Sequence, residues 1–562
     1  MLRGKDSLSS RETNDLEQQK IEMRAQIFGI YYALLHCSRT GLSNFFPQCV
    51  LRPNAIAIYG NSMSSDLLLG IDLGTSATKF ILLDSEHGVV SVHSENAGWT
   101  APRPGMAEAD AEMWWSNVIK GVPRLINKVP GVTGRSVAAI GVAGMVPALI
   151  LEDSNGVILR PSIQQNDARA SLEIEHIQNQ TVASEILART GSTISSQSIA
   201  PKLRWLAEHE PKTLAKTRTI RGSYDLISGR LAGARVVELN WAIESGLYDF
   251  ARCRWDPEMV KFSGVDANWL PPVEPPTKVV GTLLPKIAAL LGLREGIAVV
   301  AGSADHVASA FSAGIANQGD LLVKLGTACD ILAYSSKPVV DERLFFDAHL
   351  IEGAYLPNGC MAAGGNALTW FRDNFAAGTD FRSLDNSASS VPPGSLGLLF
   401  LPYLLGEKTP IFDPCSRGTL IGLTLSHGRS EAFRSILEGL SYAIRSHVTV
   451  FREIGLAPAR VRCTNGGANS ALWRQITADV LGLPLEFINN QHGSAMGAAY
   501  AAGMAIGAFN SWLEIERFIN IEETTFPQPR ATAVYDDGFE LWLETYARLK
   551  TMFPYLCAQA EK

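Results

Sequence analysis

The sequence predicts an α/β protein in which two similar domains face each other. Apolar segments of strand length alternate with amphipathic helical segments along most of the 562 residues, a pattern typical of α/β folds. The strand–turn–strand segment LLLGIDLGTSATKFILL at residues 67–83 is echoed by LLVKLGTACDILAYS at residues 321–335, and both have Leu-Gly-Thr at the turn. This echo indicates duplicated domains, and chance similarity between two generic hairpins is the alternative. A chain of this length can also bury more than one hydrophobic core.

Shifts in composition divide the chain into four parts. Residues 1–65 begin polar and charged and contain one amphipathic stretch at 21–35, so we expect a poorly ordered extension, or a start codon assigned upstream of Met63. We expect two folded domains at 66–313 and 314–535 and a helical tail at 536–562. The first residues include several acids and no apolar core, which argues against a signal or transit peptide.

The individual elements follow from apolar runs and turn residues. In the first domain we expect strands at 67–72 and 78–84, a helix at 109–128, and strands at 137–142 and 148–152 before the turn Asp153-Ser154-Asn155-Gly156. Helices should dominate 170–235, followed by a strand at 298–301 and a helix at 305–313. In the second domain, a glycine-rich turn and a helix at 472–481 should follow the repeated hairpin.

The composition limits the partners and the environment. Apolar residues make up 46% and charged residues 19% of the chain, and its net charge of −7 comes without a Lys/Arg cluster, so we expect no nucleic acid partner. No apolar run approaches the roughly 20 residues of a membrane helix, so we expect no membrane partner. The eight cysteines lack C-x-x-C or zinc-site spacing, which predicts reduced thiols in the cytoplasm.

The two repeated turns contain the residue types of an anion-binding site. Gly74, Thr75 and Ser76 in the first turn, and Gly326 and Thr327 in the second, offer backbone N–H groups and hydroxyls without bulky side chains. On opposing domains, such turns would hold the phosphates of one nucleotide between them. The chain has no G-x-x-x-x-G-K-[ST] motif, which excludes a P-loop enzyme.

Two aspartates lie beside these features. Asp72 precedes the first turn, where Mg²⁺ bound through water would make a carboxylate tolerable next to phosphates, and capping of the turn is the alternative. Asp305 lies between an apolar strand and a small-residue helix, where a helix cap and a general base for a hydroxyl proton are equally good interpretations. A histidine at the position of His306 is more often structural.

Other residue types suit a nucleoside and a polyhydroxy ligand. The glycine-rich turn at 466–469 would accept a flat adenine or a ribose against bare backbone, although it would equally serve packing alone. The Asn-Asp-x-Arg segment at 166–169 groups side chains that hydrogen-bond hydroxyls, which is a weak signal. Four tryptophans are expected mainly in cores, with Trp370 kept as a candidate lining residue: Trp114, Trp115, Trp370 and Trp473.

In their order and spacing, these motifs resemble the FGGY carbohydrate kinase family and, within it, the xylulokinase-like branch. The resemblance covers residues 66–509 and implies two actin-like (RNase H-type) ATPase domains that flank a central cleft and close on ATP and a sugar. The motifs that carry it are Gly70-Ile71-Asp72-Leu73-Gly74-Thr75-Ser76, Asn166-Asp167-x-Arg169, Ala304-Asp305-His306, Leu325-Gly326-Thr327, Gly466-Gly467-Ala468-Asn469, Leu472-Trp473-Arg474-Gln475 and Gly493-Ser494-Ala495-x-Gly497-Ala498-Ala499.

The resemblance also implies roles for individual residues. It makes Asp305 the catalytic base and Asp72 a second catalytic residue that assists the magnesium-bound phosphates through water. The ATP-binding residues that it implies are Gly74, Thr75, Ser76, Lys79, Gly326, Thr327, Gly466, Gly467, Ala468 and Asn469. The substrate-binding residues that it implies are Met145, Val146, Asn166, Asp167, Arg169, Asp305 and His306. The expected cofactors are therefore ATP and Mg²⁺, the expected partner is a small sugar, and a homodimer is suggested by family analogy alone.

Two departures from the family pattern bear on the substrate. The xylulokinase pattern has Gln-Met-His-Gly where this chain has residues 143–147, AGMVP, so Val146 replaces the histidine that would touch the ketose. Gln165 stands where a Trp usually precedes Asn-Asp. A buried site that loses a hydrogen-bonding group changes its substrate preference. These departures therefore weaken the assignment of D-xylulose as the substrate, but they do not weaken the assignment as a kinase. We expect a kinase for a ketopentose such as xylulose, and the alternatives are a kinase for a hexulose, ribulose or tetritol, a catalytically weak sugar sensor, and an actin- or chaperone-like ATPase.

Overall fold

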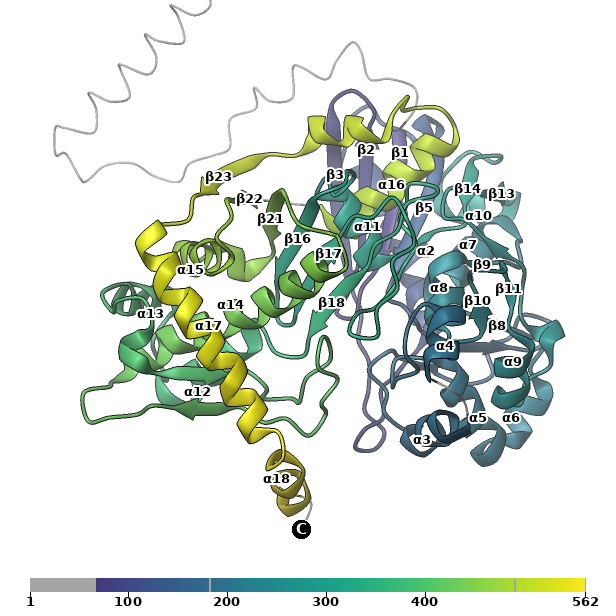
Figure 1. The fold of residues 1–562 in the computed structure, drawn as a ribbon. Helices are drawn as coiled ribbons and strands as arrows, with labels where there is room; N and C mark the ends of the chain where they lie inside the picture. Colours follow the sequence, from purple (N-terminus) through teal and green to yellow (C-terminus); the bar gives the residue numbers. More distant parts are fainter. Residues whose placement is uncertain (1–66, 181–182, 490–491, 561–562) are drawn as a thin grey trace, which may run out of the picture. The chain divides into compact units, whose positions relative to one another are not determined.

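The computed structural model describes residues 67–180, 183–489 and 492–560. All of them belong to the compact unit Met63–Lys562. The extension predicted at 1–65, and residue 66 at the predicted start of the first domain, lie outside the described residues. Within this unit, two large mixed sheets carry helices on their faces (Figure 1).

The first sheet is built around the N-terminal hairpin. β1 (Leu67–Leu73) pairs antiparallel with β2 (Ala77–Asp84), which pairs antiparallel with β3 (Gly88–Asn96). On its other side β1 is parallel to β5 (Val137–Gly144), which is followed by β14 (Ala298–Val300) and the antiparallel edge strand β13 (Val279–Thr282). The short β15 (Ser303–Ala304) also pairs with β5. β1 and β5 are buried along their whole length, which explains their continuous apolar sequences.

The second sheet repeats this arrangement. β16 (Asp320–Leu325) pairs antiparallel with β17 (Cys329–Ala333), which pairs antiparallel with β18 (Asn358–Met361). On its other side β16 is parallel to β21 (Arg460–Thr464) and, through it, to β22 (Leu485–Ile488), and β23 (Ile521–Thr525) forms an antiparallel edge. The strand order β3-β2-β1-β5-β14-β13 thus corresponds to β18-β17-β16-β21-β22-β23. This correspondence confirms the predicted α/β class with two similar domains.

Helices cover the two sheets and join them into one body. Among the main helices, α2 (Ala111–Asn127) starts where the Asp110 side chain accepts a hydrogen bond from the backbone N–H of Glu112. It buries Trp114, Val118 and Val122, which recur every four residues on one face. The other helices around the first sheet are α3 (Ser171–Gln180), α4 (Ala183–Thr190), α5 (Ile199–His209), α6 (Pro211–Lys216), α7 (Ser223–Ala232), α8 (Leu239–Glu244), α9 (Pro257–Ser263), α10 (Pro285–Leu291) and α11 (Asp305–Ser312). Those that follow β18 are α12 (Gly365–Phe375), α13 (Phe381–Ser389), α14 (Arg429–Glu453), α15 (Ala471–Leu481), α16 (Gly493–Ala505), α17 (Pro529–Leu549) and α18 (Phe553–Ala560).

Short strand pairs complete the connections. They are β4 (Glu108–Ala109) with β7 (Ser162–Ile163), β6 (Ile150–Glu152) with β8 (Thr219–Arg221), β9 (Val237–Glu238) with β12 (Val273–Glu274), β10 (Tyr248–Asp249) with β11 (Arg254–Trp255), and β19 (Leu399–Leu401) with β20 (Thr419–Ile421). The region 170–235, where helices were predicted to dominate, thus also contains the strand β8.

The helix α16 packs its backbone unusually close to the first sheet and to α11, beside β1 (Figure 1). A Cβ atom on Gly70 of β1 would lie 2.0 Å from the carbonyl oxygen of Ala495, and one on Gly497 would lie 2.2 Å from that of Ala308. Only residues without a side chain permit these approaches. The glycines therefore fix the position of the first turn of α16 relative to β1 and α11.

Two large hydrophobic cores accompany the two sheets. The second core includes Tyr535, Phe539 and Trp542 of α17, all of which are buried. The boundary predicted at 535/536 therefore falls inside a helix that packs on the second sheet's core, and the segment after 535 is not a separate tail. Among the described residues, none of the helices combines the length and the apolar character required to cross a lipid bilayer.

Candidate active site

Three adjoining cavities are connected by shared residues, and both domains line two of them, whereas residues of the second domain line the third. We call them the central cavity, of about 720 Å³, the inner cavity, of about 290 Å³, and the glycine-turn cavity, of about 610 Å³. Asn469 lines both the glycine-turn cavity and the central cavity. Lys324 lines both the central cavity and the inner cavity. The central cavity therefore connects the other two.

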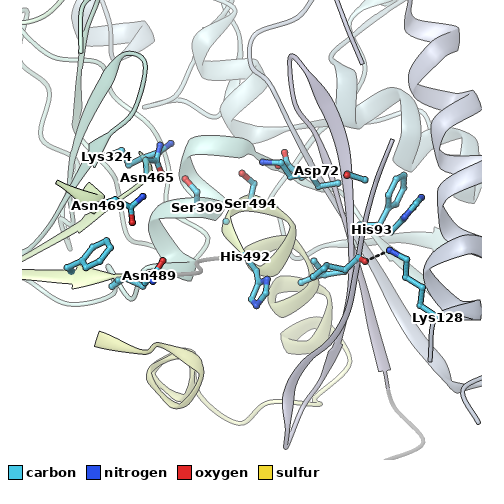
Figure 2. A pocket seen from close by; sticks show the side chains of 18 residues that line it. Asp72, His93, Lys128, Ser309, Lys324, Asn465, Asn469, Asn489, His492 and Ser494 are labelled. Carbon is cyan, nitrogen blue, oxygen red and sulfur yellow. Dashed lines mark hydrogen bonds between the residues drawn. The ribbon is translucent and has the colours of Figure 1, made fainter. Parts of the chain in front are cut away.

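Asp72 lines the central cavity near the end of β1 (Figure 2). Its side chain is buried, and its Oδ1 has no hydrogen-bond partner among the described residues. The pKa of Asp72 is raised to about 7, mainly by burial and also by the nearby carboxylate of Asp305, against the lowering effect of Lys79 and Lys324. A buried oxygen without a donor is unfavourable, so this carboxylate suits a ligand that brings a cation or a water.

The two predicted phosphate turns lie at the ends of the corresponding hairpins. In the first turn, the Gly74 N–H is used within the turn, since it donates to the carbonyl of Ala77 at 3.1 Å, and Thr75 and Ser76 are exposed. In the second turn Thr327 is exposed. None of the residues predicted in these two turns lines the three cavities, although Ala328, which follows Thr327, lines the inner cavity.

Two lysines face the central cavity from opposite domains. Lys79, predicted from the family resemblance, lines it from β2. Lys324 on β16 was not predicted, and it pairs across the hairpin with Asp330 at an Nζ–Oδ2 distance of 3.1 Å. Burial alone would lower the pKa of Lys324, but the carboxylates of Asp330 and Asp305 outweigh it and raise that pKa. Lys324 is therefore a fixed positive charge between the central and inner cavities.

Asp305 begins α11 and lines the inner cavity. Its Oδ1 accepts a hydrogen bond from the backbone N–H of His306 at 2.6 Å. The His306 ring lies between two acids, with Nε2 2.8 Å from Asp347 Oδ2 and Nδ1 3.6 Å from Asp305 Oδ1. Burial by itself lowers the pKa of His306, but these carboxylates outweigh it and hold the pKa well above its ordinary value. Asp305 is thus held at the cavity surface beside a cationic imidazole.

The acidic wall of the inner cavity was missed by the sequence analysis. Glu244, at the end of α8, and Asp347 both line this cavity, and each has one buried oxygen, Oε1 and Oδ1 respectively, without a hydrogen-bond partner among the described residues. Burial and the neighbouring Asp347 raise the pKa of Glu244 well above its ordinary value. Asn240 brings the two segments together, because its side chain donates to the Ala348 carbonyl at 3.1 Å and accepts from the Ala348 N–H at 2.7 Å. No local motif signals this wall, since its residues meet only in the fold.

The other predicted substrate residues lie around the inner cavity in different ways. Val146 lines it, whereas Met145 is buried and accepts a hydrogen bond from Ser223 through its carbonyl. Asp167 and Arg169 form an ion pair at 2.7 Å that is shielded from solvent, and the exposed Asn166 lines none of the three cavities. Asp167 and Arg169 therefore stabilise the structure by pairing with each other, whereas the neighbouring Gln165 lines the inner cavity.

Lys202 supports this lining from behind. Its side chain is fully buried, and its Nζ donates to the carbonyls of Gln164 at 2.8 Å, and of Gln165 and Gln197 at 3.4 Å each. Burial lowers the pKa of Lys202 to about 7. Since Gln165 and Gln197 both line the inner cavity, this one side chain fixes two of its wall segments.

The glycine-turn cavity contains most of the predicted nucleoside residues. Gly466, Gly467 and Asn469 line it opposite α12 and α13, whereas Ala468 is fully buried beneath the turn. Trp370, kept as a candidate lining residue, lies on α12 in a separate apolar pocket with Phe371 and Phe375. Trp114 and Trp473 are buried in the cores, as predicted.

Comparison with known proteins identifies the family. The profile of the FGGY family of carbohydrate kinases, N-terminal domain, matches residues 67–312, and that of its C-terminal domain matches residues 321–506. The chain belongs to the FGGY family of carbohydrate kinases. A xylulose kinase of Bacillus subtilis is 31% identical over 488 residues, which cover 86% of this chain and 97% of that protein. A gluconokinase of the same organism is 29% identical over 460 residues, covering 79% of this chain and 88% of that protein.

Solved structures of FGGY kinases have the same fold. The crystal structure of a xylulose kinase from Rhodospirillum rubrum matches with a TM-score of 0.82 and 39% identity, covering 87% of this chain and 99% of that one. A gluconate kinase from Lactobacillus acidophilus matches with a TM-score of 0.82 and 25% identity, over 87% of this chain and 99% of that one. The predicted family, its two-domain fold and its activity as a sugar phosphotransferase are thereby confirmed.

Proposed function

We propose that this FGGY kinase transfers the γ-phosphoryl group of ATP to a hydroxyl of a ketopentose, with xylulose as the first candidate. The observation that carries the proposal is the order of the three cavities, which are joined by Asn469 and Lys324. A nucleoside in the glycine-turn cavity would place its phosphates in the central cavity. The terminal phosphate would then face the inner cavity, where Asp305 lies.

The central cavity fits a magnesium-bound triphosphate. Asp72 would hold Mg²⁺ through water, since its buried Oδ1 has no other hydrogen-bond partner among the described residues. Bound there, the ion would neutralise part of the charge of the phosphates. Lys79 and Lys324 would contact the phosphates from the two domains. We also propose, as the family resemblance implies, that the turns at Gly74–Ser76 and Gly326–Thr327 donate backbone N–H groups to the phosphates, apart from the Gly74 N–H, which donates to Ala77.

At the junction of the central and inner cavities, two groups would act on the transfer itself. Asp305 would accept the proton of the attacking hydroxyl as that oxygen captures the phosphoryl group. Lys324 would contact the transferred group and stabilise the negative charge on its oxygens, because its ammonium borders both cavities. Both proposed roles follow from the positions of the two side chains: Lys324 lines both cavities, and Asp305 lines the inner cavity.

The inner cavity supports a small polyhydroxy substrate. Its volume of about 290 Å³ lies at the lower end of small-molecule sites, which span about 300–1,000 Å³. The unpartnered oxygens of Glu244 and Asp347 need hydrogen-bond donors, which sugar hydroxyls supply. Val146 offers only an apolar contact at the position where the xylulokinase pattern has a histidine. The similar xylulose kinases make xylulose the first substrate to test.

An aldonate such as gluconate is the second candidate. Among the described residues Lys408 lines the inner cavity without an ion-pair partner, and its Nζ lies 3.8 Å from Cys360 Sγ. A substrate carboxylate would pair with this lysine, and two of the similar proteins are named gluconokinase and gluconate kinase. The carboxylates of Asp305 and Asp347 in the same cavity oppose an anion, and more of the similar proteins are xylulose kinases, so we place gluconate behind a neutral ketose. A cytoplasmic location and a homodimer stay predictions.

The decisive experiment measures sugar-dependent ADP release from Mg·ATP. We expect xylulose to give a higher kcat/KM than ribulose, a hexulose, a tetritol or gluconate. In Asp305→Ala, kcat should fall about 10²–10⁴-fold, the usual contribution of a positioned base, while ADP binding is retained. Unchanged turnover in this variant would exclude Asp305 as the base. ATP consumption that does not depend on any added sugar would contradict the kinase proposal and favour the ATPase alternative.

A further inference from the structure

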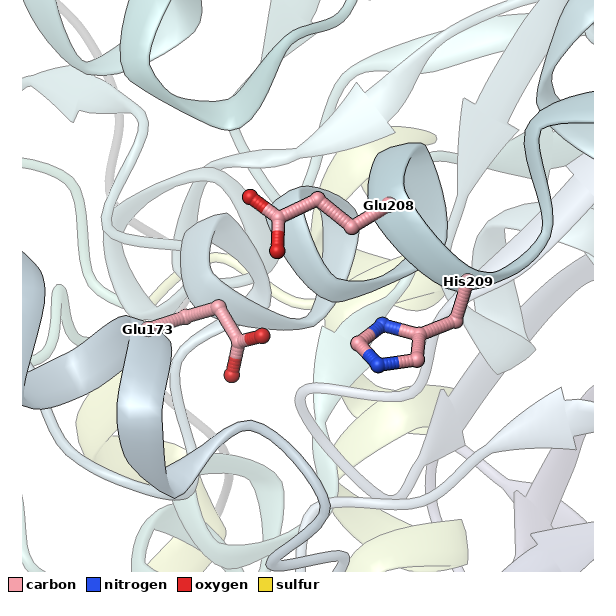
Figure 3. A group of neighbouring side chains, drawn as sticks. All are labelled: Glu173, Glu208 and His209. Atoms are coloured by element: carbon pink, nitrogen blue, oxygen red, sulfur yellow. The ribbon is translucent and has the colours of Figure 1, made fainter.

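Three metal-ligand side chains converge on the helical part of the first domain, away from the three cavities. Glu173 extends from α3, and Glu208 and His209 extend from the last turn of α5. One ligand atom from each lies within 4.8 Å of the others. Figure 3 shows the two carboxylates and the imidazole directed toward one space between these helices.

Glu173 points to a ligand in that space. Glu173 is only 7% exposed to solvent, and its Oε2 is buried without a hydrogen-bond partner among the described residues. No described cation forms an ion pair with it: Arg204, on the neighbouring α5, pairs instead with Glu208 at 2.6 Å. A buried carboxylate is strongly disfavoured unless it is paired or coordinates a metal. The structure thus leaves an unmatched acceptor that faces two further ligand side chains.

His209 is oriented as a metal ligand. Its Nδ1 lies 3.0 Å from the Trp205 carbonyl, and its ring stacks on the indole of Trp205 at 4.4 Å between centroids and an angle of 8°. Metal-binding histidines commonly donate one ring N–H to a carbonyl, which fixes the ring and leaves the other nitrogen for the metal. Here that arrangement leaves Nε2 available at the exposed end of α5.

We propose that Glu173, Glu208 and His209 bind a divalent transition-metal ion, with Zn²⁺ as the probe of choice. Two carboxylates and one imidazole are ligands that Zn²⁺ accepts, with bonds of about 2.0–2.2 Å. One ligand atom of each side chain already lies within 4.8 Å of the other two. The exposed Glu208 side chain can turn toward the ion by rotamer change, while the His209 ring keeps its position against Trp205. Water would take the open coordination position, and the ion would neutralise Glu173.

The consequence of binding is structural. α4 and α5 flank the chain segment whose residues Ser192, Ser195 and Gln197 line the inner cavity, and α3 packs against α5. An ion that joins the first turn of α3 to the last turn of α5 would hold this wall in place. We therefore expect it to raise the stability of the protein without taking part in phosphoryl transfer.

The test uses the tag-free, full-length protein after removal of metals with EDTA and buffer exchange. Calorimetric titration with Zn²⁺, in the absence of nucleotide and Mg²⁺, should show one saturable equivalent, and Zn²⁺ should raise Tm. His209→Gln and Glu173→Gln should each weaken Zn²⁺ binding at least tenfold. His176→Gln is the matched control, because His176 is an exposed histidine on α3 outside the cluster, and its affinity should equal that of the wild type.

A spectroscopic measurement separates this site from the thiols of the chain. Co²⁺ in place of Zn²⁺ should give visible d–d absorption of a nitrogen/oxygen site, which His209→Gln abolishes, without the intense near-ultraviolet band of cobalt–thiolate bonds. No saturable binding, a thiolate band, or unchanged binding in His209→Gln and Glu173→Gln would each overturn the proposal. Since none of these readouts uses kinase activity, the outcome is independent of the proposed function.

Discussion

Individual residues in the cleft balance opposite charges across the two domains. Asp72 and Asp305 from the first domain lie near Lys324 of the second: Asp305 raises the pKa of both Asp72 and Lys324, and Lys324 lowers that of Asp72. Lys324 is held by Asp330, its cross-strand neighbour. The position of this ammonium is therefore set by the hairpin before any ligand arrives, which is the kind of preorganised charge that stabilises a transition state.

Lys324→Met should remove that charge while preserving much of the side-chain volume. We expect kcat to fall about 10²–10³-fold, the usual effect of losing one preorganised group that faces developing negative charge. Lys324→Arg should recover part of the loss, because it restores the charge with a different shape. Steady-state kinetics with xylulose and ATP would show the change mainly in kcat and less in KM for the sugar.

Lys128→Met provides the control for this prediction. Lys128 also lines the central cavity, but its Nζ donates to the Val92 carbonyl at 2.8 Å, and it lies on the opposite side of Asp72 from Lys324 (Figure 2). We expect its kcat to match the wild type. Equal losses in Lys128→Met and Lys324→Met would indicate a general electrostatic effect and contradict a specific role for Lys324.

At the scale of elements, the contact of α16 with α11 and β1 positions the cleft. The residues Gly493 and Ser494 at the start of α16 line the central cavity, and α11 begins with Asp305. The close approach at Gly497 sets the distance between these two helices. Any displacement there would move both a cavity wall and the proposed base.

Gly497→Ala should therefore destabilise the protein despite the better helix propensity of alanine. The propensity gain is about 1 kcal/mol, but the new Cβ would lie 2.2 Å from a backbone oxygen of α11, and overpacking of this kind costs about 1–3 kcal/mol or more. We expect a lower Tm together with a reduced kcat. Gly98→Ala is the control, because its Cβ meets nothing within 4 Å; a Tm for Gly497→Ala equal to this control would show that α16 moves without penalty.

The sequence predicts elements well where the signal is local. The strands at 67–84 and 321–333 were predictable because their apolar runs and glycine turns repeat, and Asp72 and Asp305 because each lies at the end of a buried strand. The wall of Glu244 and Asp347 could not be predicted, since the contact between Asn240 and Ala348 that assembles it joins distant segments. Likewise, the polar residue types at 166–169 could not show that Asp167 is buried in an ion pair with Arg169.

At the scale of the whole molecule, several buried acids make stability depend on pH. Glu238 of β9 is fully buried and accepts hydrogen bonds from Tyr224 at 2.8 Å and from Asn240 at 3.2 Å. The pKa of Glu238 is raised to about 8, mainly by burial and also by Asp225 and Asp347, against the lowering effect of hydrogen bonds from the Asn240 backbone and the Tyr224 side chain. Burial also raises the pKa of Asp225 to about 7. The folded protein therefore holds protons on these groups that the unfolded chain releases at a lower pH.

The stability of the wild type should consequently fall as pH rises from about 5 to 8. In this window the unfolded chain has lost the Glu238 proton while the folded state retains it, so each pH unit removes up to about 1.4 kcal/mol for this one group. Glu238→Gln replaces the protonated acid with an amide of similar shape that does not titrate. Its Tm, measured by calorimetry at several pH values, should decline less steeply than that of the wild type, and the gap should stop changing above pH of about 8. Parallel Tm profiles for the two proteins would contradict this prediction. They would show that the pKa of Glu238 in the folded state equals its ordinary value, so that its hydrogen-bond partners stabilise the buried carboxylate without a bound proton.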